Sequence, residues 1–125
     1  MASATKEAID SALEHGGVID ITTTGRASGQ ARRLEIVFHN VGGRIYISGV
    51  PSPTRRSWIA NLDKDPHLTF HLKGKVRADL PATARIIEEE KERREILPHI
   101  ARAWGRKDLE QMVRYSPLME VTIDH

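Results

Sequence analysis

Apolar side chains recur at helical spacing near the start of the chain and at strand spacing through much of the remainder. Small and apolar residues over 4–13 follow the helical period, which predicts a helix that Ser3 caps and that continues to Glu14. Gly16 and Gly17 come next, and glycine is the residue that most often ends a helix. The chain is therefore expected to begin with a short amphipathic helix.

Six later segments alternate apolar and polar side chains or are rich in β-branched residues, and we expect them to be strands. They are residues 18–23, 31–39, 44–48, 67–72, 75–80 and 118–123. Turns join most of them, which argues against a parallel sheet with crossover helices. Pro81, after the fifth segment, predicts a sheet edge, a bulge or a crossing point. The predicted fold class is mainly β with peripheral helices, as a small antiparallel barrel or curled sheet.

Helical patterns return after the third predicted strand and again in the tail. Thr54 can cap a short helix that runs to Leu62, and the Asp65-Pro66 pair stops it. The tail is helical in pattern over residues 88–97, 98–104 and 107–115, with Pro98 opening the second segment and Gly105 following it.

The size and composition are those of one folded domain, since the chain has 125 residues and is 39% hydrophobic and 29% charged. We expect a single domain over 1–125, with the N-terminal helix in 1–16 and a helical segment at 88–115 before the closing strand. No apolar run is long enough for a membrane span, and no secretory signal begins the chain. The lack of cysteine excludes disulfides and agrees with a cytoplasmic protein.

Basic residues are concentrated in the middle of the chain. Residues 21–82 hold ten Lys and Arg against four acidic residues, a net charge of +6, whereas residues 1–20 carry −3 and residues 83–125 carry −1. This excess indicates an anionic partner such as a phosphate or a carboxylate, or else a solvated basic face without a partner. A nucleic-acid partner is disfavoured, because only six residues are aromatic and could stack on bases.

The polar loop Gly25–Arg33 is the first candidate site. Its two glycines allow a sharp turn that exposes backbone N–H groups, and Ser28 adds a hydroxyl. Arg26, Arg32 and Arg33 add guanidinium groups, which bind phosphate or carboxylate well. The loop matches neither a Walker nor a dinucleotide-binding pattern. It is therefore an anion site or a solvated hairpin turn that carries arginines.

The segment from Pro51 to Trp58 is the second candidate site. A loop that enters a helix presents unpaired N–H groups, and Arg55 and Arg56 strengthen the positive field there. Trp58 covers a flat ligand or anchors the helix to the core.

Histidine spacing does not predict a metal site. His67 and His71 lie on one strand face about 13 Å apart by the strand rise, too far to share an ion. Tyr115 follows helical spacing near the end of the last predicted helix, where it lids a pocket or packs in the core.

The order of these segments resembles the deazaflavin-dependent nitroreductase and quinone-reductase family, which has the flavin split-barrel fold. Residues 24–32 match its Thr-Gly-Arg-x-Ser-Gly-x-x-Arg pattern, and residues 58–66 match its Trp-x-x-Asn-Leu-x-x-Asp/Asn-Pro pattern. The segments GRIYISG and LMEVTI extend the resemblance, which covers residues 17–124. It implies a six-stranded antiparallel split β-barrel and an enzyme that uses coenzyme F-420, a deazaflavin with a phosphate and an oligoglutamate tail.

The family's cofactor contacts map onto particular residues of this chain. By resemblance, the cofactor-binding set is Arg26, Ala27, Ser28, Arg32, Arg33, Leu34, Glu35, Ile36, Ser48, Gly49, Val50, Arg55, Arg56, Ser57, Trp58 and Asn61. Within it, Arg26, Ser28 and Arg32 are expected at the phosphate and tail. Hydride transfer to an enone, quinone or related acceptor also requires a proton, for which Tyr115, Ser48 and solvent are the candidates.

The chain departs from the family pattern at two of these positions. Ala27 stands where family members often have Lys or Arg, which removes one tail contact. Glu35 stands where many nitroreductases have Pro; it either points toward the ring, faces solvent or pairs with Arg33. The partner expected is a small-molecule acceptor, with no nucleic acid and no membrane, and the protein is a monomer or a homodimer. The alternative function is an FMN- or haem-binding split barrel.

Overall fold

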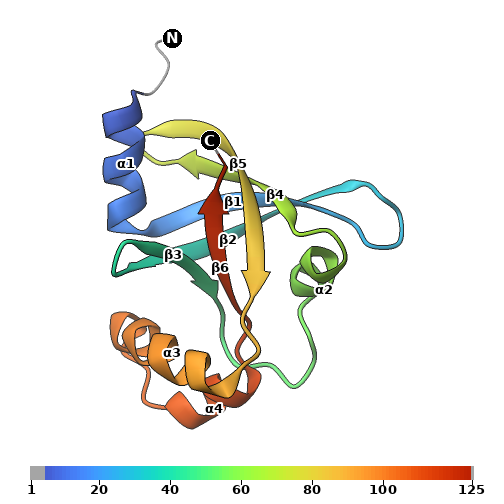
Figure 1. Cartoon of the computed structure of the whole chain (residues 1–125), viewed down its shortest axis with the longest axis vertical. Coiled ribbons are helices and arrows are strands. Elements are labelled where there is room, and N and C mark those ends of the chain that lie inside the picture. Colours follow the sequence, from blue (N-terminus) through green and yellow to red (C-terminus); the bar gives the residue numbers. More distant parts are fainter. Residues whose placement is uncertain (1–4, 125) are drawn as a thin grey trace.

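Six antiparallel strands close into a barrel in the order β1-β2-β3-β6-β5-β4 in the computed structural model, which describes residues 5–124 (Figure 1). The strands are β1 Gly17–Thr24, β2 Ala31–Val41, β3 Arg44–Ser48, β4 His67–Lys73, β5 Arg77–Ile86 and β6 Leu118–Ile123. The helices are α1 Lys6–His15, α2 Ser57–Lys64, α3 Glu90–Trp104 and α4 Leu109–Tyr115. The predicted mainly β fold, a closed antiparallel barrel with peripheral helices, is confirmed.

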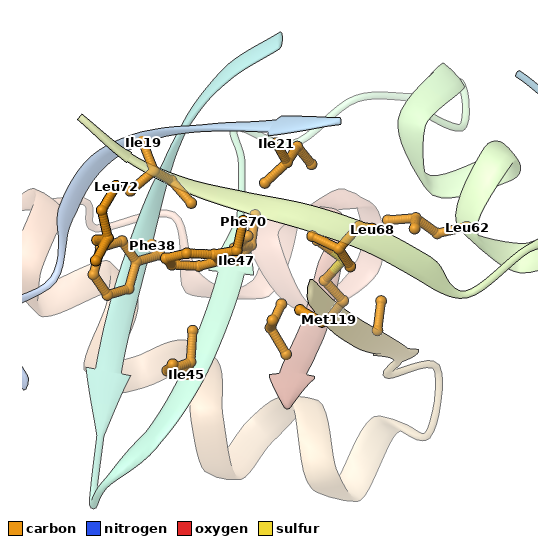
Figure 2. Close-up of a cluster of buried hydrophobic side chains, with 13 residues drawn as sticks. Ile19, Ile21, Phe38, Ile45, Ile47, Leu62, Leu68, Phe70, Leu72 and Met119 are labelled. Atoms are coloured by element: carbon orange, nitrogen blue, oxygen red, sulfur yellow. The ribbon is translucent and has the colours of Figure 1, made fainter. Parts of the chain in front are cut away.

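Inward-facing side chains of the strands fill the barrel (Figure 2). Ile19 and Ile21 of β1 are 1% and 0% exposed, and the rings of Phe38 and Phe70 meet edge to face at a centroid distance of 5.1 Å. Burial of each such side chain stabilises the fold by about 1.5–3 kcal/mol. The strand alternation in the sequence is thus the alternation between the core and the outer face of the barrel.

Helix α1 covers one side of the barrel, and its cap is not the one predicted. Ser3 lies outside the described residues, and the side chain that caps α1 is Thr5, whose Oγ1 accepts from the amide of Ala8 at 3.1 Å. Gly16 ends the helix at φ +74°, and a Cβ there would lie 3.0 Å from the carbonyl oxygen of Phe38. Both the backbone conformation and the close approach therefore require glycine.

Helix α2 begins later than the capping prediction placed it. Thr54 does not cap it, since α2 starts at Ser57 and its N-cap is Arg56, which makes no side-chain capping bond. The reason is local, because the hydroxyl of Ser52 donates to the carbonyl of Thr54 at 2.9 Å and holds this segment as a turn. The predicted stop at Asp65 is confirmed.

Two prolines that were expected to mark the ends of elements lie inside elements of the structure. Helix α3 continues through Pro98, where two helices were expected, because Leu97 and Ile100 on either side are fully buried and their packing outweighs the lost hydrogen bond. Strand β5 was expected over 75–80, but it begins at Arg77 and continues through Pro81 to Ile86. Pro81 lies just before the residues of β5 that pair with β6. Within residues 5–124, no helix has the length and apolar character needed to cross a membrane.

Candidate functional site

A pocket of about 500 Å³ lies between the tip of the β1–β2 hairpin and helix α2. We call it the hairpin-loop pocket. Its lining residues are Thr23, Gly25, Arg26, Ala27, Ser28, Arg32, Arg33, Leu34, Ser57, Trp58 and Asn61. The structure thus brings together residues of both sequence motifs, which lie about thirty positions apart along the chain.

The loop at the hairpin tip owes its shape to two glycines. The amide of Gly25 donates to the carbonyl of Gln30 at 2.8 Å, and the amide of Gly29 donates to the carbonyl of Gly25 at 2.8 Å. A Cβ on Gly25 would lie 2.9 Å from Oγ of Ser28, and Gly29 has φ +72°. The turn therefore needs glycine for space at one position and for conformation at the other.

Asn61 of α2 connects the loop to the helix. Its Oδ1 accepts from the backbone amide of Arg26 at 3.1 Å and from Nη1 of Arg26 at 3.0 Å. Its Nδ2 donates to Oγ1 of Thr23 at 3.2 Å. Asn61 and Thr23 are 5% and 2% exposed, so the bond between them is shielded from water. From this buried position Asn61 holds the exposed Arg26 through two part-buried bonds.

Two arginines of the hairpin-loop pocket keep their charge available. Among the described residues, neither Arg26 nor Arg32 forms an ion pair with a carboxylate; the guanidinium of Arg26 contacts only Asn61 and the carbonyl of Ser57. Arg33, by contrast, donates through Nε to Oδ2 of Asp20 at 2.9 Å. Arg26 and Arg32 are thus the side chains that can bind an anionic ligand.

The position of Trp58 is compatible with either of the roles considered for it. It is half-buried, packs against the hydrophobic core of the barrel and also lines the hairpin-loop pocket. Leu34 of β2 lines the same pocket and packs against the same core. The pocket therefore has an apolar wall beside its two available arginines.

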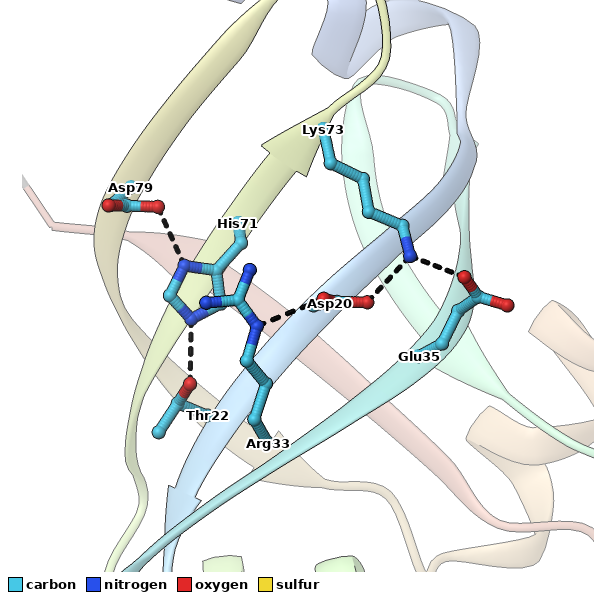
Figure 3. A network of polar contacts seen from close by, with 7 residues as sticks. All are labelled: Asp20, Thr22, Arg33, Glu35, His71, Lys73 and Asp79. Carbon is cyan, nitrogen blue, oxygen red and sulfur yellow. Dashed lines mark hydrogen bonds and ion pairs between the residues drawn. The ribbon is translucent and has the colours of Figure 1, made fainter.

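Glu35 lies on the outer face of the barrel, in a polar network with Asp20, Arg33 and Lys73 (Figure 3). Of the alternatives considered for Glu35, exposure to solvent is confirmed, since its side chain is 66% exposed. Pairing with Arg33 is not observed, because Lys73 reaches both Glu35 and Asp20 while Arg33 pairs with Asp20. Glu35 does not line the hairpin-loop pocket. Hydrogen bonds from Lys73 and then Arg33 hold the pKa of Asp20 below its ordinary value.

The same outer face holds His71, which is 7% exposed. Its Nε2 lies 2.7 Å from Oγ1 of Thr22 and its Nδ1 lies 2.7 Å from Oδ1 of Asp79 (Figure 3). Contact with His71 lowers the pKa of Asp79. Throughout residues 5–124, no group of three or more His, Cys, Asp or Glu residues could hold a metal ion. We call the seven residues of Figure 3 the outer-face network.

A second pocket, of about 460 Å³, lies on the other side of the first turn of α2, and we call it the α4 pocket. Its lining residues are Ser52, Pro53, Thr54, Arg55, Arg56, Ile59, Ile86, Ile87, Glu88, Glu90, Arg93, Arg94, Val113, Arg114, Tyr115, Ser116, Pro117 and Leu118. Three predicted site residues, Arg55, Arg56 and Tyr115, lie here rather than in the hairpin-loop pocket. Tyr115 is 46% exposed.

The remaining predicted site residues line neither of these pockets. Ser48 is 2% exposed and its hydroxyl donates to the carbonyl of Pro117 at 2.6 Å. Gly49 lies against Pro117 as well, Val50 is 51% exposed, and Ile36 packs against the barrel core. Ser48 and Gly49 therefore join the end of β3 to the segment before β6.

Two supporting residues were not found from the sequence. Thr23 is the buried partner of Asn61, and Lys64 donates through Nζ to the carbonyl of Arg26 at 2.7 Å. Lys64 follows Asn61 by three positions and so faces the same side of α2. This spacing could have indicated from the sequence that Lys64 lies near the same loop. No local pattern predicts the role of Thr23, because the sequence around it is that of an ordinary strand rich in β-branched residues.

Comparison with known proteins gives a family model and a set of similar folds. The model of the F420H(2)-dependent quinone reductase family matches residues 2–121, which confirms the resemblance drawn from the motifs. No curated protein matches the sequence.

Three solved structures illustrate the fold. The conserved hypothetical protein Rv2991 from Mycobacterium tuberculosis is 17% identical, has a TM-score of 0.75, and is matched over 100% of this chain and 85% of its own. An F420-H2 dependent reductase (FDR-A) is 24% identical, with a TM-score of 0.62 over 85% of this chain and 94% of its own. HutZ, a haem storage protein from Vibrio cholerae, is 12% identical, with a TM-score of 0.67 over 95% of this chain and 87% of its own. At these identities the likeness shows the split-barrel fold.

Proposed function

Because the chain belongs to the F420H(2)-dependent quinone reductase family and is therefore an F-420-dependent reductase, we propose that it transfers a hydride from reduced F-420 to an electron-poor organic acceptor, a quinone or an enone. The observation that carries the proposal is the chemistry of the hairpin-loop pocket. Arg26 and Arg32 have no carboxylate partner among the described residues, and they stand beside the apolar surface of Trp58 and Leu34.

The residues of this pocket fit the cofactor. F-420 combines a flat deazaflavin with a phosphate and a chain of glutamates, so it needs an apolar wall and several cations. Arg26, Arg32 and the hydroxyl of Ser28 would hold the phosphate and tail. Trp58 and Leu34 would contact the ring system. Ala27 contributes no charge, so the tail depends on the two arginines.

When bound, reduced F-420 supplies the hydride for a two-electron reduction. The acceptor gains this hydride and one proton, so that a quinone becomes a hydroquinone while the cofactor is oxidised. The chain's own contribution is to position the reactants. Ser48 is disfavoured as the proton donor, since its hydroxyl already donates to Pro117. Tyr115 is retained as a donor beside solvent, because its exposed phenol lines the neighbouring α4 pocket.

Parallel titration of the apoprotein with F-420 and FMN, followed by fluorescence, tests the cofactor. We expect F-420 to bind at least about tenfold more tightly, because FMN has one phosphate and no glutamate tail to engage both Arg26 and Arg32. Tighter binding of FMN would overturn the proposal in favour of a flavin-binding split barrel. If F-420 is preferred, oxidation of the reduced cofactor by quinones and enones then measures the acceptor range.

A further inference from the structure

The α4 pocket and the hairpin-loop pocket are separated by the first turn of α2. Arg55, Arg56 and Ile59 line the α4 pocket, whereas Ser57, Trp58 and Asn61 line the hairpin-loop pocket. The backbone from 55 to 61 is therefore a shared wall. A molecule in the α4 pocket would lie next to the proposed cofactor site, as an acceptor must.

Both carboxylates that line the α4 pocket are already paired. Glu88 accepts from Nη2 of Arg55 at 3.2 Å, and Glu90 accepts from Nε of Arg94 at 2.9 Å. These two arginines have second carboxylate partners outside the pocket lining, at 3.0 Å in Asp63 and 2.7 Å in Glu110. Among the lining residues alone, the two arginines therefore offset the two glutamates, and both glutamates are paired.

Three other arginines of the α4 pocket form no ion pair within residues 5–124. Arg56 donates to the carbonyl of Val50 at 3.1 Å, and no hydrogen bond joins the Arg114 side chain to another described residue, although its charge contributes, after that of Arg94, to the lowered pKa of Glu110. Arg93 is 8% exposed and donates only to backbone carbonyls, those of Ile87, Met112, Val113 and Ser116. Burial lowers the pKa of Arg93, and the nearby charge of Glu88 offsets only part of this desolvation.

A buried hydroxyl lies beneath the surface of the same pocket without a partner. Ser116 is a lining residue and is 4% exposed, and its Oγ, which lies beneath the cavity surface, has no hydrogen-bond partner among the described residues. An unpaired buried hydroxyl costs about 1–3 kcal/mol, so such groups normally meet a partner in the functional state. Guanidinium donors around one cavity are what a carboxylate or sulfonate group accepts from.

We propose that the α4 pocket binds the anionic substituent of the acceptor, a carboxylate or sulfonate attached to the reducible quinone or enone. This inference rests on the proposed function, because the molecule bound is the acceptor of the same reaction. Arg114 and Arg56 contact the anionic group, and Arg93 supplies a fixed positive field behind them. The anionic group takes no part in electron transfer and sets only which acceptor binds.

Anthraquinone-2-sulfonate and the neutral 2-(hydroxymethyl)anthraquinone form a matched pair of probes. We expect the apoprotein to bind the sulfonate about tenfold more tightly by calorimetry. Arg114→Gln should reduce sulfonate affinity about fivefold with a smaller loss for the neutral probe, and Arg114→Lys should restore most of it.

Arg102→Gln is the control for net charge, since Arg102 is exposed on α3 and lies about 13 Å along the helix axis from Arg93. Equal affinity for the two probes, or the same loss in Arg102→Gln as in Arg114→Gln, would overturn the inference. Turnover with reduced F-420 separates the two proposals. Reduction of both anthraquinones without preference would leave the proposed function standing, whereas a failure of F-420 to bind would refute that function while the calorimetry still tests the pocket.

Discussion

Two polar surfaces that include residues of the β1–β2 hairpin differ in whether their basic side chains are paired with carboxylates. On the barrel wall, in the outer-face network, Arg33 and Lys73 each reach a carboxylate (Figure 3). At the hairpin tip, Arg26 and Arg32 have no carboxylate partner among the described residues. Paired charges across strands support the sheet, whereas unpaired charges around a pocket remain available to a ligand.

The energetic difference between these surfaces follows from exposure. Arg33 is 56% exposed at the side chain, and ion pairs this exposed contribute only about 0–1 kcal/mol each. Arg26 and Arg32 form no such ion pair and lack this small stabilisation. Their charges can instead bind an anion in a pocket partly shielded from water. The comparison therefore predicts that mutations at the tip change binding and mutations in the network change stability.

The largest effect is expected from Asn61→Ala, which affects both properties. The change removes the acceptor of Arg26 and leaves the hydroxyl of Thr23 buried without a partner, so the free energy of unfolding should fall by about 1–3 kcal/mol. F-420 affinity should fall as well, because Arg26 is no longer held. Urea denaturation and cofactor titration measure the two losses. Asn40→Ala is the matched control, since Asn40 bonds Leu13 on the α1 side and should affect stability alone.

A smaller and more selective effect is expected from Arg32→Ala. Loss of one charged donor should weaken F-420 by about tenfold, with little effect on a deazaflavin that lacks the tail. The free energy of unfolding should stay within about 0.5 kcal/mol of the unmutated protein, because Arg32 pairs with no described carboxylate. Equal loss for both ligands would argue against a role of Arg32 at the tail.

The smallest effect is expected from Lys73→Met in the outer-face network, and it depends on pH. Lys73 is the main cause of the lowered pKa of Asp20, whose ordinary value is 3.8. A lowered carboxyl pKa stabilises the fold above that ordinary value, and the contribution disappears as pH falls through the folded-state pKa. The difference in urea midpoint between the two proteins should therefore be full at neutral pH and shrink below about pH 4.

The control for Lys73→Met is cofactor binding, which should stay within about twofold of the unmutated protein because Lys73 does not line the hairpin-loop pocket. A difference in urea midpoint that is constant down to low pH would show that the contact acts through packing rather than through the charge of Asp20.

Much of the fold followed from local pattern. The bounds predicted for β3 and β6 agree with the structure, because consecutive side chains of a strand alternate between the core and the outer face and the sequence shows this alternation directly. Helix boundaries were less predictable. Thr54 has the side chain of a cap but is held in a turn by Ser52, and Pro98 breaks the local helical pattern but not α3, where buried neighbours on both sides stabilise the helix.

The sequence by itself determined the barrel class, the family and the loop rich in arginine, because alternation, glycine positions and motif spacing are properties of neighbouring residues. Only the tertiary structure decided which arginines are paired. Arg33 meets Asp20 and Glu35 meets Lys73 through the register of three strands, and Arg55 and Arg56 lie across α2 from Arg26. The physical reason is that a pairing between exposed charges is weak and joins distant segments, so it follows from the packing of the core and leaves little local trace.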